Sequence, residues 1–183
     1  MAEYYFDIET YSPGEKPNPE TDKIISIQFQ RMDLETGRPI GDLIILKEWE
    51  SSEEKIVKNF YDIFFREGLD IWNFVMVGNN LNFDFEFLIL KFEKYLGKKL
   101  SSKDLHCIRP HFDIKPFLVM LNGGNFKGAS LDKFTKKNQN GRAIKDYYQN
   151  KEYSKIEDYI KNETESFLEF LQKIISNKNK LLE

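Results

Sequence analysis

Hydrophobic and polar residues alternate along the first quarter of the chain. Residues 4–10, 23–32 and 43–49 are rich in aromatic and branched side chains, and the connections between them are rich in Pro, Gly and Asn. Alternation with a period of two predicts strands, and such connections predict turns. Because no helical pattern separates the three segments, they favour an antiparallel meander.

The pattern changes to a helical period after residue 50. Ser51 and Glu54 form a capping-box pattern, and apolar residues at three- and four-residue steps continue to about Arg66. A short apolar run over 74–78 predicts a buried strand. Residues 83–97 predict a helix that is closed by its terminal glycine.

The remaining segments complete a layered fold. Residues 111–114 predict a fifth strand, and residues 130–137 predict a short helix capped by its first serine. The longest predicted helix, 155–176, opens on a second capping box made by Ser154 and Glu157. A strand meander followed by alternating helices and strands predicts an α/β fold, in which helices flank a mixed five-stranded sheet.

Composition limits the class of protein. The 183 residues fit one domain, and 40% apolar with 31% charged residues is typical of an ordinary soluble protein. A single cysteine, Cys107, excludes an intrachain disulfide and a four-cysteine zinc site. No apolar run approaches the roughly 20 residues that span a bilayer, and the signal-peptide pattern is absent. We therefore expect a cytoplasmic protein without membrane contact, one domain over 1–183, with a frayed tail from about residue 177.

Charge leaves two interpretations open. The net charge of −3 gives no basic field over the whole chain. Residues 131–145 nevertheless carry five basic side chains against one acid, Asp132; the basic residues are Lys133, Lys136, Lys137, Arg142 and Lys145. The segment is either a solvated helix face and loop or a patch that binds phosphate.

Two acids lie within the first predicted strand. Because strand side chains alternate between faces, Asp7 and Glu9 share one face with Tyr5. The two carboxylates are about 7 Å apart along the strand. Like charges at that spacing repel unless a positive charge lies between them.

Two further acids lie in unusual places. Glu163 is in the middle of the apolar face of the last predicted helix, one turn after Tyr159. A carboxylate there is paired, protonated or bound to a metal ion. Asp84 follows the strand 74–78 at the start of a helix. Ligands bind at such edges of open α/β sheets, although the helix dipole alone also favours an acid there.

The four acids form an oxygen-only ligand set, which suits Mg²⁺ or Mn²⁺ rather than zinc. Two such ions about 3.5–4 Å apart can clamp the attacking and leaving oxygens of a phosphodiester. Solvated edge-strand acids and a salt-bridged Glu163 remain the alternatives.

A second candidate metal cluster is formed by His106, Cys107 and His111. Zinc sites usually need four good ligands, or three and a water, so neutral histidines near a strand start are the simpler interpretation. Asp113, which follows closely, either supports the metal site from behind or caps the next helix.

Three short motifs resemble, in order and spacing, those of the DEDD 3′–5′ exonucleases, a family of the RNase H-like superfamily. The stretch "FDIET" is similar to the first motif, D-x-E-T. The stretch "GNNLNFDFEFL" is similar to the second, G-[HY]-N-x-x-F-D, with Asn79 in the His or Tyr position. The stretch "YIKNE" is similar to the third motif of the tyrosine subclass, Y-x-x-x-D, with Glu163 in place of Asp. The resemblance covers Tyr4 to about Leu171 and includes the predicted exonucleases related to the exonuclease domain of family B DNA polymerases.

The resemblance implies a three-layer RNase H-like fold with two Mg²⁺ or Mn²⁺ ions. Asp7 would bridge both ions, Glu9 and Glu163 would complete the site of the ion that carries the attacking water, and Asp84 would hold the second ion. Tyr159 would orient that water, since an unperturbed tyrosine, with a pKa near 10, is a poor base. Glu163 is one methylene longer than the usual Asp, and misplacements of about 1 Å can cost about 10²-fold in rate.

The resemblance also implies residues that bind the terminal nucleotide: Thr10, Tyr11, Asn80 and Phe83. Tyr11 would stack on a terminal base, although an ordinary loop aromatic explains it equally well.

The implied activity is hydrolysis of terminal phosphodiesters at single-stranded 3′ ends of DNA or RNA, releasing nucleoside 5′-monophosphates. A polymerase or a repair protein is a possible partner. Two alternatives stay open: a structure-specific endonuclease with the same metal site, and a catalytically weak RNase H-like module that binds nucleic acid or a polymerase.

Overall fold

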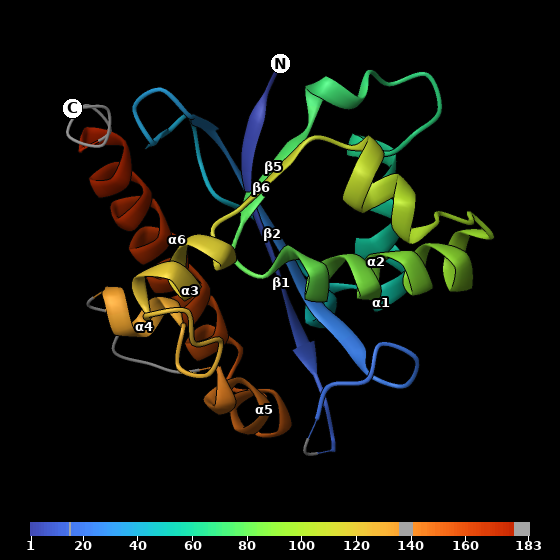
Figure 1. Cartoon of the computed structure of the whole chain (residues 1–183). Helices are drawn as coiled ribbons and strands as arrows, with labels where there is room; N and C mark the ends of the chain where they lie inside the picture. Colours follow the sequence, from blue (N-terminus) through green and yellow to red (C-terminus); the bar gives the residue numbers. More distant parts are fainter. Residues whose placement is uncertain (15, 136–140, 178–183) are drawn as a thin grey trace.

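A mixed sheet forms the centre of the protein, with helices on both faces (Figure 1). The computed structural model describes residues 1–14, 16–135 and 141–177. In these ranges the sheet has six strands in the order β3-β2-β1-β5-β6, with β4 also paired to β2. The strands are β1 (Glu3–Tyr11), β2 (Lys23–Asp33), β3 (Arg38–Pro39), β4 (Ile44–Lys47), β5 (Val75–Gly78) and β6 (His111–Asp113).

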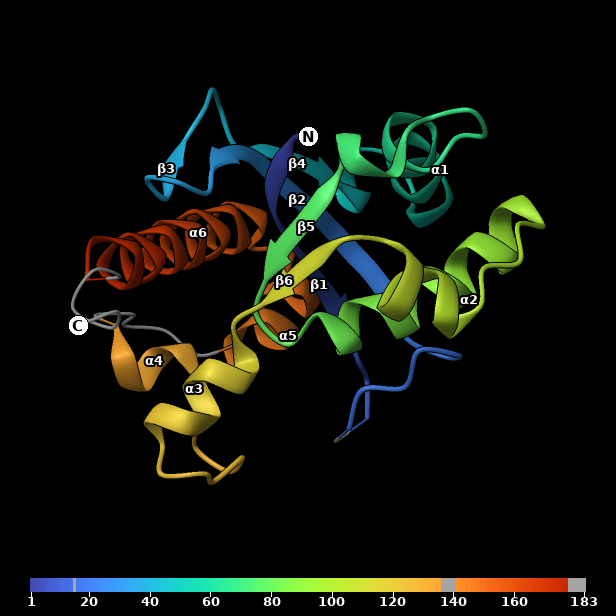
Figure 2. The same ribbon diagram turned by 45° about the horizontal axis from the view of Figure 1, so that its top comes forward.

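The helices form the outer two layers. Figures 1 and 2 show α1 and α2 on one side of the sheet and α3 to α6 on the other. Their bounds are α1 (Glu53–Phe64), α2 (Leu81–Leu96), α3 (Lys115–Leu121), α4 (Leu131–Phe134), α5 (Arg142–Gln149) and α6 (Tyr153–Ser176). Within the described residues, none of these helices has both the length and the apolar character needed to cross a bilayer.

The sheet confirms the predicted meander and adds one strand. β2 pairs antiparallel with β1 and β4, whereas β5 pairs parallel with β1 and β6. The sequence predicted five strands. The sixth, β3, has two residues inside the predicted turn, where Arg38 pairs with Asp33 and Pro39 with Met32.

The alternation of β1 divides the interior into two cores. Phe6 and Ile8 are buried against α1 and α2. Tyr5, on the opposite face, packs against Phe167 of α6, with their ring centroids 5.0 Å apart. The face that carries Asp7 and Glu9 is therefore turned toward α6.

Both predicted capping boxes are wrong. Ser51 closes a 3₁₀ turn through its N–H to the Glu48 carbonyl, so α1 begins one residue later and its N-cap is Ser52, which accepts the Lys55 N–H at 3.2 Å. Ser154 lies inside α6 rather than before it. The end of α5 runs closely into α6, which leaves Glu152 as the N-cap without a side-chain bond.

The short helix predicted over 130–137 is α4, which ends at Phe134 and is not capped by a side-chain hydrogen bond from Ser130. Lys136, Lys137 and the tail from residue 178 lie outside the described residues.

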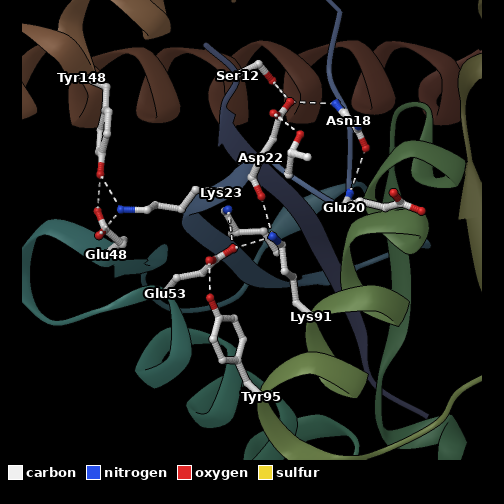
Figure 3. A network of polar contacts seen from close by, with 12 residues as sticks. Ser12, Asn18, Glu20, Asp22, Lys23, Glu48, Glu53, Lys91, Tyr95 and Tyr148 are labelled. Carbon is white, nitrogen blue, oxygen red and sulfur yellow. Dashed lines mark hydrogen bonds and ion pairs between the residues drawn. The ribbon is translucent and has the colours of Figure 1, made fainter. Parts of the chain in front are cut away.

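A buried network ties the loop between β1 and β2 to the helices (Figure 3). Lys91 of α2 is only 1% exposed; it donates to the main-chain carbonyl of Asp22 and lies 3.1 Å from Glu53 Oε1. Glu53 also accepts the Ile24 N–H at 2.8 Å and the Tyr95 hydroxyl at 2.6 Å. These bonds hold the start of β2 against α1 and α2.

The Asp22 carboxylate closes the same loop on itself (Figure 3). It accepts hydrogen bonds from the Ser12 hydroxyl, from the Asn18 N–H at 2.7 Å and from the Thr21 hydroxyl at 3.1 Å. Burial acts to raise the pKa of Asp22, but these bonds and the charge of Lys91 outweigh it and lower that pKa below its ordinary value. The loop that follows the first motif is therefore fixed at both ends.

Candidate active site

Three carboxylates from distant parts of the chain meet between β1 and α6. Oxygens of Asp7, Glu9 and Glu163 all lie within 4.8 Å of one another, and the three side chains are half-buried. Asp7 and Glu9 come from one face of β1, and Glu163 comes from the apolar face of α6, as the two periodicities predict. We call these three residues the acid cluster.

Two tyrosine hydroxyls lie beside the acid cluster. Burial, the charges of Glu9 and Glu163 and a hydrogen bond with Glu163 raise the pKa of Tyr159 far above its ordinary value. Burial, followed by the charges of Asp7 and Glu163, likewise raises the pKa of Tyr5 well above its ordinary value. Both hydroxyls therefore keep their protons at neutral pH and are available as hydrogen-bond donors.

Asp84 lies close to the cluster but outside the group of three. It is 2% exposed, and its Oδ1 accepts the Ile8 N–H of β1 at 3.1 Å. Burial and the charge of Asp7 raise its pKa well above the ordinary value. Asp84 is thus a buried carboxyl next to Asp7, whereas the sequence grouped all four acids equally.

The conformation of the turn before α2 places Asp84 at this position. A Cβ on Gly78 would lie 2.7 Å from the Phe6 carbonyl oxygen, so only glycine fits there. Asn80 has a left-handed backbone conformation, with φ of 66°, which asparagine tolerates better than most residues. Asp113 accepts the N–H groups of Asn80 at 2.8 Å and Leu81 at 3.0 Å, so it caps the start of α2.

The residues fit a divalent cation. The donor set is all oxygen, which suits Mg²⁺ or Mn²⁺. Asn79 adds a further acceptor: its buried Oδ1 has no hydrogen-bond partner in the described part of the chain. Asn79 lines a small cavity together with Asp7 and Glu163. A cation bound here would satisfy the Asn79 carbonyl and offset the repulsion between the carboxylates.

The chain is similar to solved structures along almost its whole length. It matches the family B DNA polymerase from the hyperthermophilic archaeon Pyrobaculum calidifontis with a TM-score of 0.68 and 18% identity, over 96% of this chain. It matches E. coli exonuclease I, solved in complex with a dT13 oligonucleotide, with a TM-score of 0.64 and 12% identity, over 99% of this chain. The chain has an RNase H-like exonuclease fold. No protein-family model and no curated protein matches its sequence.

The exonuclease fold of this chain spans only part of those proteins. It covers 24% of the polymerase and 42% of exonuclease I. The likeness therefore shows the fold alone, and any function has to be argued from the side chains at the site.

Gln28 is a residue of the exonuclease fold that the sequence analysis missed. It lies opposite Asp7 in the β1–β2 pairing, is fully buried, and donates from Nε2 to Asp7 Oδ2 at 2.9 Å. Its Oε1 accepts the buried Ser26 hydroxyl at 3.1 Å, which fixes the orientation of the amide. Polar residues at every second position of β2 suggest a solvated face, and only the pairing register reveals their contact with Asp7.

The predicted nucleotide-binding residues separate into three places on the exonuclease fold. Thr10 and Phe83 line a hollow of about 490 Å³ together with Glu9 and Lys145, whose Nζ donates to the Pro13 carbonyl at 2.7 Å. Asn80 lines a different hollow. The Tyr11 ring packs on Tyr148, with centroids 4.9 Å apart, and its hydroxyl accepts a bond from Gln149 at 3.1 Å. These contacts match the interpretation of Tyr11 as an ordinary aromatic residue that packs against its neighbours.

The second candidate metal cluster, His106, Cys107 and His111, does not come together in the structure. The rings of His106 and His111 both pack edge-on against Phe85, with centroids 5.0 and 5.4 Å away. In the described ranges, no group of three potential metal ligands includes these histidines or Cys107.

Proposed function

We propose that this chain is a metal-dependent 3′–5′ exonuclease that removes nucleoside 5′-monophosphates from single-stranded ends, working as one domain over residues 1–183. The observation that carries the proposal is the meeting of Asp7, Glu9 and Glu163 within 4.8 Å on an exonuclease fold. Nucleic acid as substrate is supported by the dT13 strand bound to exonuclease I, a protein of the same fold.

The acids divide into two sets of ligands. Asp7, Glu9 and Glu163 would hold one Mg²⁺ or Mn²⁺ ion, and Asp7 with Asp84 would hold a second. The chemistry supplied at these residues would be Lewis-acid activation of water and stabilisation of negative charge on the departing 3′ oxygen. Tyr159, which is hydrogen-bonded to Glu163, would donate a hydrogen bond that orients the attacking water. Thr10 and Phe83, beside Glu9, would contact the terminal nucleotide.

A degradation assay tests the proposed function. A 5′-labelled single-stranded oligonucleotide is incubated with the protein and Mn²⁺, on matched DNA and RNA strands. A ladder that shortens from the 3′ end supports the exonuclease. A few internal cuts would instead support an endonuclease, and a gel shift without cleavage would support a binding module.

Shortening Glu163 to aspartate is expected to keep or raise the rate. The Glu163→Asp side chain loses one methylene and approaches the ligand length that the third exonuclease motif usually has. The measurement is kcat at saturating Mn²⁺, with Glu165→Asp, an exposed acid on the same helix, as control. A folded Glu163→Asp protein without any activity would show that Glu163 does not act as a ligand of this kind.

Gln28→Leu is expected to weaken Mn²⁺ binding about 10- to 100-fold, which is the usual effect of losing a hydrogen bond to a metal ligand. The change removes the donor that orients Asp7 but keeps a side chain of similar size in the core. Calorimetric titration with Mn²⁺ measures it. The control is Gln30→Leu, two residues along β2, where the amide donates to the Gly41 carbonyl. Equal Mn²⁺ affinity in both variants would contradict a positioning role for Gln28.

A further inference from the structure

A second hollow lies between the first turn of α2 and α3. Its volume is about 270 Å³, slightly smaller than the sites of about 300 Å³ and more that bind small ligands. Apolar surface comes from Pro116, Val119 and Phe126, and polar groups come from Asn80, Asn82 and Lys115. Apolar walls with a few side-chain amides at the edge suit a flat heterocycle that carries hydrogen-bonding groups on its rim.

Phe126 is held outward by a preformed turn. Its side chain is 73% exposed, which is unusual for a phenylalanine. The Asn122 amide donates to the carbonyls of Asn125 at 2.6 Å and Lys127 at 3.1 Å, the two residues that flank Phe126. The Gly124 N–H adds a bond to the Val119 carbonyl at 3.0 Å. The ring is therefore presented by an ordered backbone and does not need to be organised on binding.

The hollow begins next to the acid cluster. Asn79 lines the small cavity with Asp7 and Glu163, and the following residue, Asn80, lines the second hollow. Two consecutive residues at the start of α2 therefore line both sites, so a strand held at the acid cluster would pass close to this hollow.

The local charge is compatible with a phosphate backbone. Asp113 also lines the hollow, but its carboxylate accepts three main-chain N–H groups: those of Asn80, Leu81 and Lys115. Residues 115–134 carry three lysines against one acid. Lys115 is fixed by a bond from Nζ to the neutral Ala129 carbonyl at 2.6 Å, and it lines the hollow together with Asp113.

We infer that this hollow binds a base of the single strand close to the scissile phosphate. The base stacks on Phe126, and its edge faces the amides of Asn80 and Asn82. Stacking on an aromatic ring tolerates every base, so the subsite adds affinity without sequence preference. The inference rests on the proposed function for the identity of the strand.

The test compares binding and cleavage in Phe126→Ala with a matched control. Leu121→Ala removes another exposed apolar side chain at the end of α3 that does not line the hollow. Binding of a fluorescein-labelled twelve-nucleotide oligo-dT is measured by anisotropy with Ca²⁺ in place of Mn²⁺. We expect Phe126→Ala to weaken binding about 5- to 150-fold, the range of one lost base–aromatic stack. Phe126→Tyr should restore it, and Leu121→Ala should bind as the wild type does.

The cleavage arm separates this inference from the proposed function. We expect the ratio of kcat/KM for the twelve-nucleotide strand to kcat/KM for a dinucleotide to fall in Phe126→Ala and to hold in Leu121→Ala. If the wild type binds the strand but cuts nothing, the proposed function fails while the binding arm still decides the subsite. Equal affinities for wild type and Phe126→Ala, or an equal loss in Leu121→Ala, would overturn the subsite alone.

Discussion

Replacement of Asp7 by alanine is expected to abolish strand degradation. Asp7 lies in the acid cluster with Glu9 and Glu163, and its charge helps to raise the pKa of the nearby Asp84. Loss of Asp7 would therefore remove a ligand from both proposed ion sites. Metal-ion stabilisation of transition-state charge is worth several kcal/mol, and each 1.36 kcal/mol corresponds to about tenfold in rate. We therefore expect kcat to fall by at least about 10³-fold, measured by release of the 3′-terminal nucleotide in Mn²⁺.

The control for Asp7→Ala is Glu3→Ala. Glu3 lies on the same face of the same strand but at its opposite end, next to Val75 of β5. The expected result is full activity in Glu3→Ala and a folded, inactive Asp7→Ala protein. Undiminished degradation by Asp7→Ala would mean that the acid cluster is not where the reaction occurs.

Lys91→Met is expected to destabilise the fold by about 3–5 kcal/mol, the usual cost of removing one partner of a buried ion pair. Glu53 would keep its charge in the interior, and the Asp22 carbonyl would lose its donor (Figure 3). For a chain of this size the loss corresponds to a fall in Tm of about 6–20 °C. Calorimetric or circular-dichroism melting curves measure it.

Two further variants serve as controls for Lys91→Met. Lys58→Met breaks the ion pair with Asp62 on the surface of α1, and such exposed pairs contribute less than about 0.5 kcal/mol. Combining Lys91→Met with Glu53→Gln should recover part of the loss, because no uncompensated charge then stays buried. If Lys91→Met and Lys58→Met melted alike, the network would not be what fixes the loop between β1 and β2.

The face on which each acid of the cluster lies could be predicted, because it is set within a single strand or helix. The two-residue period of β1 places Asp7 and Glu9 on one face, and the helical period places Glu163 on the buried face of α6. Glycine in the second motif could be recognised as a turn residue, but its physical reason, the close approach of a Gly78 Cβ to the Phe6 carbonyl, needs the packed sheet. The faces of β1 and α6 are thus local features, whereas the meeting of the two faces was implied by the order and spacing of the three motifs.

The rest depends on contacts that the sequence does not specify. Gln28 meets Asp7 only through the register of two strands, and Asp84 meets the Ile8 N–H only once α2 packs against β1. The cap of α1 moved from Ser51 to Ser52 because a 3₁₀ turn used the first serine. Short helices such as α3, seven residues long, gave no pattern that was distinct from the surrounding turns.

Calorimetric titration of the metal-stripped protein with Mn²⁺ tests the central claim most directly. Saturable binding by the wild type and by Glu3→Ala, lost or at least about tenfold weaker in Asp7→Ala, is the predicted result. Binding of Mn²⁺ that is equal in all three proteins, or absent from the wild type, would contradict a metal centre at Asp7, Glu9 and Glu163.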